Sequence, residues 1–280
     1  MATELKVADY FAMETRRGAL KIPGRFNRAE LITPTNLAAV HRRRRPGLMN
    51  KKTCPMVSVI IPAHNEEAYL GQTLEAINRQ HYRNFEIIVI ANGCTDRTVG
   101  IAEGHCQNLI VMGEKGLSRA RNLGARDARG DVLLFLDADT LLEWDALETI
   151  AQCFTRQYAA GTLRGRPDAK RLSYRLIYWL KNLEHRWRLH AGSSGVILCW
   201  KDDFQAVGGF DERLEVMENS DLIKKLMSLG KYLYMDQTTA TTSMRRYQKN
   251  GLTGACKLWL KLWFKSLFGD VRRQRYETVR

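Results

Sequence analysis

The sequence lacks the paired cysteines, the apolar start and the long apolar runs that mark several common protein classes. Its six cysteines are scattered, without a Cys-x-x-Cys pair or a histidine at ligand spacing. That pattern argues against a zinc site and a disulfide framework, and it is typical of a reducing cytoplasm. No apolar stretch follows the first basic residues, so we expect no secretory signal. No run approaches the ~18 apolar residues that span a bilayer, so we expect a chain that does not cross a membrane by itself.

Positive charge is in excess, and it is confined to the two ends of the chain. The 280 residues carry a net charge of +14 at pH 7. Residues 1–53 hold twelve Lys/Arg against four Asp/Glu and residues 245–280 hold ten against two, which is +8 at each end and leaves −2 for residues 54–244. A nucleic-acid-binding fold carries its basic surface on the folded domain, so nucleic acid is not expected as a partner. The basic ends indicate contact with an anionic membrane surface, or ends that are merely solvated.

Between residues 54 and 140, short apolar runs alternate with polar stretches of helical pattern. Runs rich in Val, Ile and Leu that stop at polar or turn residues are typical of buried strands. We expect strands at 57–62, 85–90, 108–112 and 132–136, and helices at about 65–80, from 95 onward and at 116–129. Asn65 is the expected N-cap of the first helix, followed by acidic residues in its first turn. The alternation predicts an α/β fold in which a mostly parallel sheet has helices on both faces.

Polar clusters follow three of these strands. In a parallel sheet the carboxyl ends of the strands share one edge, and ligands bind there. The clusters are His64-Asn65-Glu66-Glu67, Asn92-Gly93-Cys94-Thr95-Asp96 and Asp137-Ala138-Asp139. Their convergence predicts a ligand site at the carboxyl edge of the sheet.

Asp137 and Asp139 are candidates for metal ligands at that edge. In an extended strand their side chains point to the same side, roughly 7 Å apart at 3.3 Å per residue. Paired carboxylates repel each other unless a cation lies nearby, and such hard oxygen ligands suit Mg²⁺ or Mn²⁺. These residues alone leave a second interpretation open, in which the pair forms an Asx turn that caps a helix beginning near Trp144.

Five segments in order resemble the signature segments of glycosyltransferase family 2. Residues 57–67 and 87–98 are similar to its nucleotide-binding half. The next two are Ala120-Arg121-Asn122-x-Gly124 and Phe135-Leu136-Asp137-Ala138-Asp139, and Gly208-Gly209-Phe210-Asp211-Glu212 resembles the acceptor-side signature. The resemblance covers about residues 55–245, and the ordered set is specific although each piece alone is not.

The resemblance implies a GT-A fold, with a Rossmann-like nucleotide-binding half at 54–140 and an acceptor half at 141–244. Residues 1–53 would then be a basic N-terminal extension and linker, and residues 245–280 a basic, amphipathic C-terminal segment. The implied activity is transfer of a hexosyl or similar sugar, with inversion, from a nucleotide-sugar donor to a lipid-linked or polysaccharide acceptor. Together with the basic ends, this suggests an enzyme that is peripheral on the inner, cytoplasmic face of the cell membrane and makes surface polysaccharide or glycolipid.

The resemblance also assigns the donor site. Asp139 would bind Mn²⁺ or Mg²⁺ directly, and Asp137 would help through the ribose or a metal-bound water. The residues that would line the base and ribose pocket are Pro62, Ala63, Asn65 and Glu67. Arg121 would approach the diphosphate, unless it is a surface charge on an exposed helix face. Asn92 stands where many members have one of two paired aspartates; its amide can still bond a base edge.

The catalytic base is less well marked. The family usually has Glu-Asp before a helix, whereas this chain has Glu218 followed by Asn219, and an amide cannot take a proton from a hydroxyl at neutral pH. Glu218 and Asp221 are the remaining carboxylates, and Glu218 is preferred because Asp221 could equally be an acid of the first helical turn. Asn219 also keeps an alternative open, a catalytically degenerate transferase fold that binds a nucleotide-sugar or a partner without turnover.

Three further segments have two interpretations each. The first segment, Gly192-Ser193-Ser194-Gly195, is either a flexible turn or a lining of the sugar site. The second, Thr242-Ser243-Met244-Arg245-Arg246, either brings guanidinium groups to the diphosphate or begins the basic tail. Residues 255–268 place Lys257, Lys261 and Lys265 on one stripe of a helix otherwise rich in Trp, Leu and Phe. Such a helix either lies in the headgroup region of a membrane or packs against its own domain. In the membrane interpretation, residues 171–190 would extend the same surface.

Overall fold

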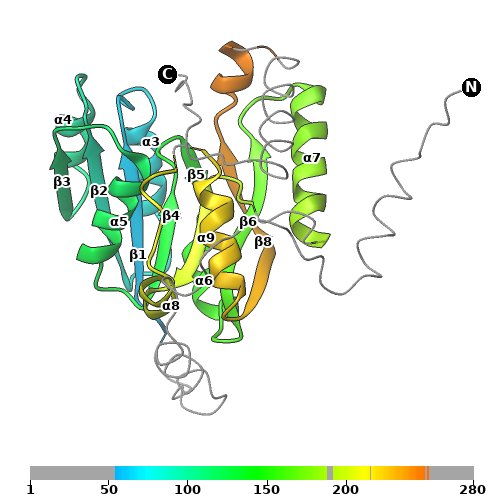
Figure 1. Cartoon of the computed structure of the whole chain (residues 1–280). Helices are drawn as coiled ribbons and strands as arrows, with labels where there is room; N and C mark the ends of the chain where they lie inside the picture. The colour runs from blue at the N-terminus through cyan, green and yellow to red at the C-terminus, as the bar shows by residue number, and fades with distance from the viewer. Residues whose placement is uncertain (1–53, 188–191, 215, 250, 252–280) are drawn as a thin grey trace, which may run out of the picture.

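The computed structural model describes residues 54–187, 192–214, 216–249 and 251, and within these the chain forms one eight-stranded sheet with helices on both faces (Figure 1). The strand order is β3-β2-β1-β4-β7-β6-β8-β5. The strands are β1 (Val57–Ala63), β2 (Phe85–Asn92), β3 (Asn108–Met112), β4 (Val132–Leu136), β5 (Thr140–Leu142), β6 (Tyr158–Pro167), β7 (Val196–Trp200) and β8 (Lys231–Thr242). The helices are α3 (Leu70–Asn78), α4 (Thr98–Glu103), α5 (Leu117–Asp127), α6 (Ala146–Cys153), α7 (Leu172–Trp187), α8 (Lys201–Ala206) and α9 (Glu218–Met227).

The sheet is parallel in its first half and mixed in its second. Strands β3, β2, β1 and β4 pair in parallel, and they are the four strands predicted from the apolar runs. Strand β7 then pairs antiparallel with β4, and β6 pairs antiparallel with β7. Strands β6 and β8 are parallel, and β5 is antiparallel to β8. The α/β class, the mostly parallel sheet and the helices on both faces are confirmed, and the antiparallel pairs all involve β5 or β7.

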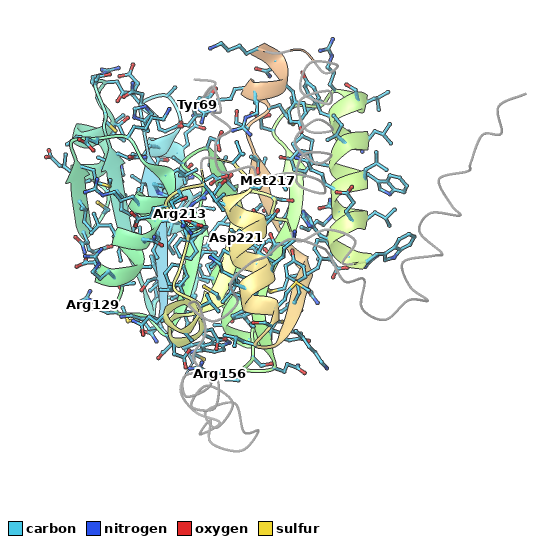
Figure 2. The ribbon with its side chains drawn as sticks, viewed as in Figure 1. Tyr69, Arg129, Arg156, Arg213, Met217 and Asp221 are labelled. Atoms are coloured by element: carbon cyan, nitrogen blue, oxygen red, sulfur yellow. The ribbon has the colours of Figure 1, made fainter. Side chains whose placement is uncertain are left out.

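The two ends of the sheet carry different polar groups (Figure 2). At the amino edge, Arg129 binds the buried Glu86 at 2.9 Å. Arg156 binds Asp202 at 2.6 Å and stacks on Trp200 at the same edge. Figure 2 shows Arg129 and Arg156 at this lower end, and Tyr69 toward the opposite, upper end. The ion pairs at the amino edge belong to the framework, and the polar clusters predicted to bind a ligand lie at the other edge.

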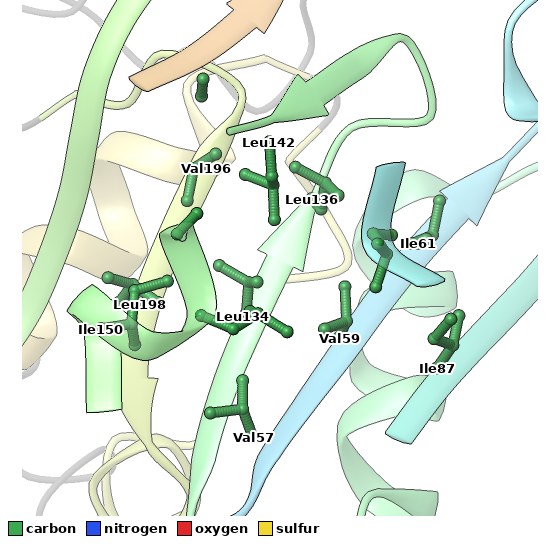
Figure 3. Packing of buried hydrophobic residues seen from close by; sticks show 14 of the residues in the cluster. Val57, Val59, Ile61, Ile87, Leu134, Leu136, Leu142, Ile150, Val196 and Leu198 are labelled. Carbon is green, nitrogen blue, oxygen red and sulfur yellow. The ribbon is translucent and has the colours of Figure 1, made fainter. Parts of the chain in front are cut away.

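Alternation along β1 gives the sheet its two buried faces. Val57, Val59 and Ile61 belong to one core cluster and Ile60 to the other, because successive side chains of a strand point to opposite faces. Figure 3 shows the first cluster, in which strand residues pack against Ile150 of α6. Helices α3, α4 and α6 cover this face, and helices α5, α8 and α9 cover the other. The core therefore holds the carboxyl ends of β1, β2 and β4 in register.

The predicted N-cap at Asn65 is wrong. Asn65 has a left-handed backbone, with φ +53°, and helix α3 begins only at Leu70. Asparagine tolerates this conformation better than most residues. The Asn65 side chain instead accepts a hydrogen bond from the Thr95 N–H at 2.8 Å. The segment after β1 is thus a loop that binds the loop after β2.

The packed chain continues past residue 244. Met244 and Tyr247 are buried in a small cluster with Tyr174 and Tyr178 of α7, so a boundary after 244 divides a packed segment. The predicted extension 1–53 and the Trp-rich helix at 255–268 lie outside the described residues. In the described part of the chain, no helix is both long enough and apolar enough to cross a bilayer.

Gly124 lets α5 approach the sheet closely, and replacing it should destabilise the fold. A Cβ at Gly124 would lie 2.6 Å from both Ile60 Cγ2 and Ile90 Cδ1. We expect Gly124→Ala to lower the free energy of unfolding by about 1–3 kcal/mol in urea titrations, because overpacking a core forces strain. Gly100→Ala on α4 is the matched control: its Cβ would meet nothing within 4 Å. Equal stabilities for the two variants would contradict close packing at Gly124.

Candidate active site

Six charged side chains from five segments meet at the carboxyl edge of β1 and β4. Two arginines hold them together, each bridging acids that are distant in sequence. The residues are Glu66 after β1, Arg121 on α5, Asp137 and Asp139 after β4, Glu218 on α9, and Arg245 after β8. The sequence predicted this edge as the site, and it singled out all of these positions except Glu66 as individual side chains.

Arg121 is the first of the two bridges. Its side chain is only 4% exposed, so the alternative of a surface charge is wrong. Its Nη2 donates to Asp137 Oδ1 at 3.0 Å, and its Nη1 donates to Glu218 Oε1 at 3.1 Å and Asn219 Oδ1 at 2.8 Å. A buried arginine requires such partners, since an unpaired buried charge is costly. Arg121 therefore joins the predicted ribose ligand to the preferred catalytic base.

Arg245 is the second bridge, which shows that residue 245 is part of the folded edge and not simply the start of a tail. Its two terminal nitrogens bind both oxygens of Glu66, at 2.7 and 2.6 Å. Its Nε lies 3.0 Å from Asp139 Oδ2. The guanidinium also stacks over the ring of Tyr69, 4.6 Å from the centroid. Burial alone would lower the pKa of Arg245, but the hydrogen bonds that it donates to Glu66 and the charge of Asp139 raise it, so this cation is permanent.

The segment from Asp137 to Thr140 is a turn and not an extended strand end. The Thr140 N–H donates to the Asp137 carbonyl at 3.1 Å, which closes the turn. The two aspartates bind different arginines, Asp137 with Arg121 and Asp139 with Arg245. The Asp137 N–H donates to the carbonyl of Gly195 at 3.0 Å. Gly195 has φ +80°, and a Cβ there would lie 2.7 Å from Thr140 Oγ1. Glycine is therefore required where the 192–195 segment passes the aspartates.

Asp139 is the most perturbed carboxyl of this cluster. Burial raises its pKa to about 6, Arg245 opposes the rise, and the neighbouring charges of Asp137 and Glu66 add to it. Burial and neighbouring negative charge both disfavour the ionised form of a carboxyl group. The raised pKa therefore shows that Arg245 alone does not offset the burial of Asp139 and the two acids beside it.

The two candidate bases occupy different surroundings on α9. Glu218 is the first residue of the helix, with a side chain 12% exposed and bound to Arg121. Asp221 instead pairs with Lys225 of the same helix at 2.7 Å. Met217, directly before Glu218, has φ +62°, a left-handed backbone that costs a non-glycine residue about 1–3 kcal/mol. Met217 and Asp221 are labelled in Figure 2, where α9 approaches the upper edge. The geometry brings Glu218 into the charged cluster and gives Asp221 a separate partner.

The predicted base and ribose residues lie on the neighbouring strand ends and loops. Pro62 and Ala63 are buried at the end of β1. Glu67 accepts hydrogen bonds from the backbone and the side chain of Arg97, at 3.2 and 3.3 Å. Asn92 is buried, and its Oδ1 accepts the Gly116 N–H at 2.7 Å, which fixes the start of α5. Together with the contact of Asn65 and Thr95, these bonds join the loops after β1 and β2 into one wall.

The acids at this edge fit a divalent cation that takes only part of its shell from protein. Across the ranges that the structure describes, no three His, Cys, Asp or Glu side chains converge as a full set of ligands. Mg²⁺ and similar ions are usually bound by one or two carboxylates, with water and substrate phosphates completing the shell. The turn at 137–140 supplies two carboxylates of this kind, beside a third on Glu66.

Two residues important to the arrangement were missed by sequence reasoning. Glu66 lies in a predicted polar cluster, but nothing in the sequence pairs it with a residue 179 positions away. Asn122 binds the N–H and the carbonyl of Phe210, at 3.0 and 2.9 Å, and so joins two of the signature segments. Phe210 in turn lies under Arg121, with its ring centroid 5.2 Å from the guanidinium carbon. The sequence signals for the contact between Asn122 and Phe210 were the two motifs that contain these residues.

Comparisons with known proteins agree with this geometry. The family model described as "Glycosyl transferase family 2" matches residues 58–202. An uncharacterized glycosyltransferase of Haemophilus influenzae is 26% identical over 61% of this chain and 62% of its own length. The probable glycosyltransferase YdaM of Bacillus subtilis is 29% identical over 66% of this chain and 49% of its own length. The matches thus span less than two thirds of these relatives.

Solved structures share the fold at low sequence identity. The mannosyltransferase PcManGT of Pyrobaculum calidifontis, in complex with GDP-Man and Mn²⁺, superposes with a TM-score of 0.57 and 18% identity, covering 81% of this chain and 71% of that one. S. aureus TarS 1–349 in complex with UDP-GlcNAc gives a TM-score of 0.56 and 19% identity, covering 79% and 62%. At these identities the likeness shows the GT-A fold.

Proposed function

Because the chain belongs to glycosyltransferase family 2, we propose that it transfers a sugar, with inversion, from a nucleotide-sugar donor to a lipid-linked or polysaccharide acceptor. The observation that carries the proposal is the convergence of Asp137, Asp139 and Glu218 on two arginines at the carboxyl edge. Acids for a metal, cations for phosphates and a candidate base lie there in two ion-pair groups, one around Arg121 and one around Arg245.

The donor side of the proposal rests on the first four strands. Asp139 would hold Mn²⁺ or Mg²⁺, and Asp137 would help through the ribose or a water on the ion. Bound there, the ion would supply Lewis-acid stabilisation of the charge on the departing diphosphate. Arg121 and Arg245 are assigned to the diphosphate, because guanidinium groups bind phosphate oxygens well. The mannosyltransferase in complex with GDP-Man and Mn²⁺ supports this assignment by likeness of fold.

The base and ribose pocket would be formed by the joined loops after β1 and β2. Pro62, Ala63, Asn65 and Glu67 line it on one side, and Asn92 closes its floor. Asn65, Glu67 and Asn92 already accept hydrogen bonds from Thr95, Arg97 and Gly116, so the proposed pocket would be preorganised. Preorganisation lowers the entropy cost of binding the nucleotide.

Glu218 acts as the general base in this proposal. Its carboxylate takes the proton of the acceptor hydroxyl as that oxygen attacks the anomeric carbon. The bond from the anomeric carbon to the diphosphate breaks in the same displacement, which inverts the configuration. The hydrogen bond that Arg121 donates orients the Glu218 carboxylate. Asp221 is the second candidate, and its pair with Lys225 directs it elsewhere.

The proposed location is the inner face of the cell membrane. Each end of the chain carries +8, whereas the folded body is nearly neutral. Polybasic segments are attracted to anionic lipid leaflets. A lipid-linked acceptor would be presented at such a surface.

A screen of nucleotide-sugar hydrolysis tests the proposal. The purified chain is incubated with UDP- and GDP-linked sugars, with and without Mn²⁺, and released nucleotide is measured. We expect slow release from one donor class, dependent on the ion, because water can replace the acceptor at an assembled site. Tight nucleotide-sugar binding without turnover under any ion, even after acceptor lipid is added, would favour the degenerate, binding-only alternative. No binding of any donor would reject both.

A further inference from the structure

Helix α7 exposes a stripe of large apolar side chains on its outer side. Figure 1 shows α7 at the outer flank of the described fold, beyond β6. The exposed residues recur at intervals of three, four and seven, which places them on one face of a helix. They are Leu172 (78% exposed), Leu176 (57%), Trp179 (58%), Leu180 (48%) and Trp187 (63%), and we call them the α7 stripe.

The opposite side of α7 faces the protein. Tyr174, Tyr178 and His185 are buried, and the two tyrosines pack with Met244 and Tyr247. Asn182 exchanges two hydrogen bonds of 2.9 Å with the backbone of Gly165 on β6. The helix is therefore firmly held through its inner side, and the α7 stripe is not needed for that packing. Five large apolar side chains gathered on one exposed face are more than scattered surface residues explain.

A basic groove runs beside the α7 stripe. The cavity, of about 770 Å³, lies between α7 and strands β6 and β8. Arg164, Arg166, Arg175 and Arg186 line it, together with Leu176 and Trp179 of the stripe. Arg166 pairs with Glu143 and Arg186 with Asp236, whereas no acid among the described residues pairs with Arg164 or Arg175. The groove thus offers unneutralised guanidinium groups next to an apolar surface.

We propose that the α7 stripe and the basic groove form the face by which this protein lies on an anionic phospholipid bilayer. Exposed Trp and Leu side chains match the boundary between headgroups and acyl chains, where tryptophan is enriched. Arg164 and Arg175, at the border of the stripe, match the lipid phosphates, which are the complementary charge. A bilayer satisfies both features at once, since it places phosphate directly above hydrocarbon.

This inference deepens the proposed membrane location by naming the surface, and it rests on that proposal. It does not involve the donor site, since no stripe residue contacts the charged cluster of Glu66, Arg121 and Arg245. Donor hydrolysis without lipid should therefore be unchanged by substitutions in the α7 stripe. The failure of one proposal can thus be distinguished from the failure of the other.

Vesicle sedimentation of the full chain tests the face. The vesicles contain phosphatidylglycerol and phosphatidylcholine, or phosphatidylcholine alone. We expect Leu176→Glu with Trp179→Glu to lower the partition coefficient about tenfold or more, because it places charge at the acyl boundary. We expect Arg164→Gln with Arg175→Gln to lower binding about fivefold or more, only on vesicles with phosphatidylglycerol. Arg119→Gln with Arg126→Gln on α5 removes the same charge elsewhere, and it should have a smaller effect.

Three outcomes would overturn the inference. Wild-type protein that fails to sediment with anionic vesicles would reject it outright. Unchanged partition of both α7 variants, with circular dichroism matching the wild type, would move membrane contact to other parts of the chain. Analytical ultracentrifugation without lipid gives the third: a wild-type dimer that Trp179→Glu dissociates would make the stripe a protein interface. The exposed position of these side chains makes misfolding of the variants an unexpected result, and the arginine variant provides a second, independent measurement.

Discussion

Asp139→Ala is expected to abolish sugar transfer while the fold persists. The proposed metal role contributes several kcal/mol of charge stabilisation, and each ~1.4 kcal/mol is a factor of ten in rate, so a loss of about three orders of magnitude or more follows. The fold should survive because Arg245 keeps both bonds to Glu66 when Asp139 is removed. Loss of activity would then reflect the site and not the framework.

The measurement is the rate of donor turnover, with unfolding in urea recorded in parallel. Asp202→Asn is the matched control, since Asp202 is also an acid paired with an arginine but lies at the amino edge of the sheet. It should leave turnover close to that of the wild type. A chelator should mimic Asp139→Ala and be reversed by added Mn²⁺. If chelator and substitution both leave turnover intact, the metal mechanism is wrong.

Glu218→Gln is expected to lower turnover by about 10²–10⁴, the usual contribution of a general base. Glutamine keeps an oxygen that can accept the hydrogen bond from Arg121 Nη1, so the ionised base is removed with little change of shape. Nucleotide affinity should be nearly unchanged, since the proposed pocket lies on the loops after β1 and β2.

Asp221→Asn is the matched comparison on the same helix. It removes the charge of the second candidate and weakens only its pair with Lys225, so activity should change little. Single-turnover rates and nucleotide titrations of both variants separate chemistry from binding. A full loss in Asp221→Asn with an active Glu218→Gln would reverse the assignment.

The parallel half of the fold was predictable because its signals are local. Runs such as Val132–Leu136 are continuous, apolar and stopped by acids, and they became strands with the predicted bounds or nearly so. The meeting of the 64–67, 92–96 and 137–139 clusters followed from parallel topology alone. Asn65 failed as an N-cap because its side chain found a partner, Thr95, on another loop. Capping rules consider only neighbouring residues, so they cannot predict a hydrogen bond to a residue 30 positions away.

The two arginine bridges show what a single sequence hides. Arg121 has the polar appearance of a surface residue, yet it is buried against Phe210, Asp137 and Glu218, all distant in sequence. Arg245 reads as the first residue of a basic tail, yet β8 returns it to Glu66 and Asp139. The antiparallel entry of β7 was equally hidden, because an apolar run records burial but not the direction of its neighbour.

The seam between β4 and β7 limits how the molecule can open. Five registered pairs, from Val132 with Trp200 to Leu136 with Val196, join the two halves in one ladder, and both core clusters cross the seam. A hinge between the halves would have to break that ladder and expose those clusters. Gating by domain closure is therefore disfavoured, and access to the carboxyl edge is left to its loops. The segment 192–195 and the turn at 243–245 contact the aspartates directly. Local movements of these two loops would therefore control the entry of substrate and the release of product.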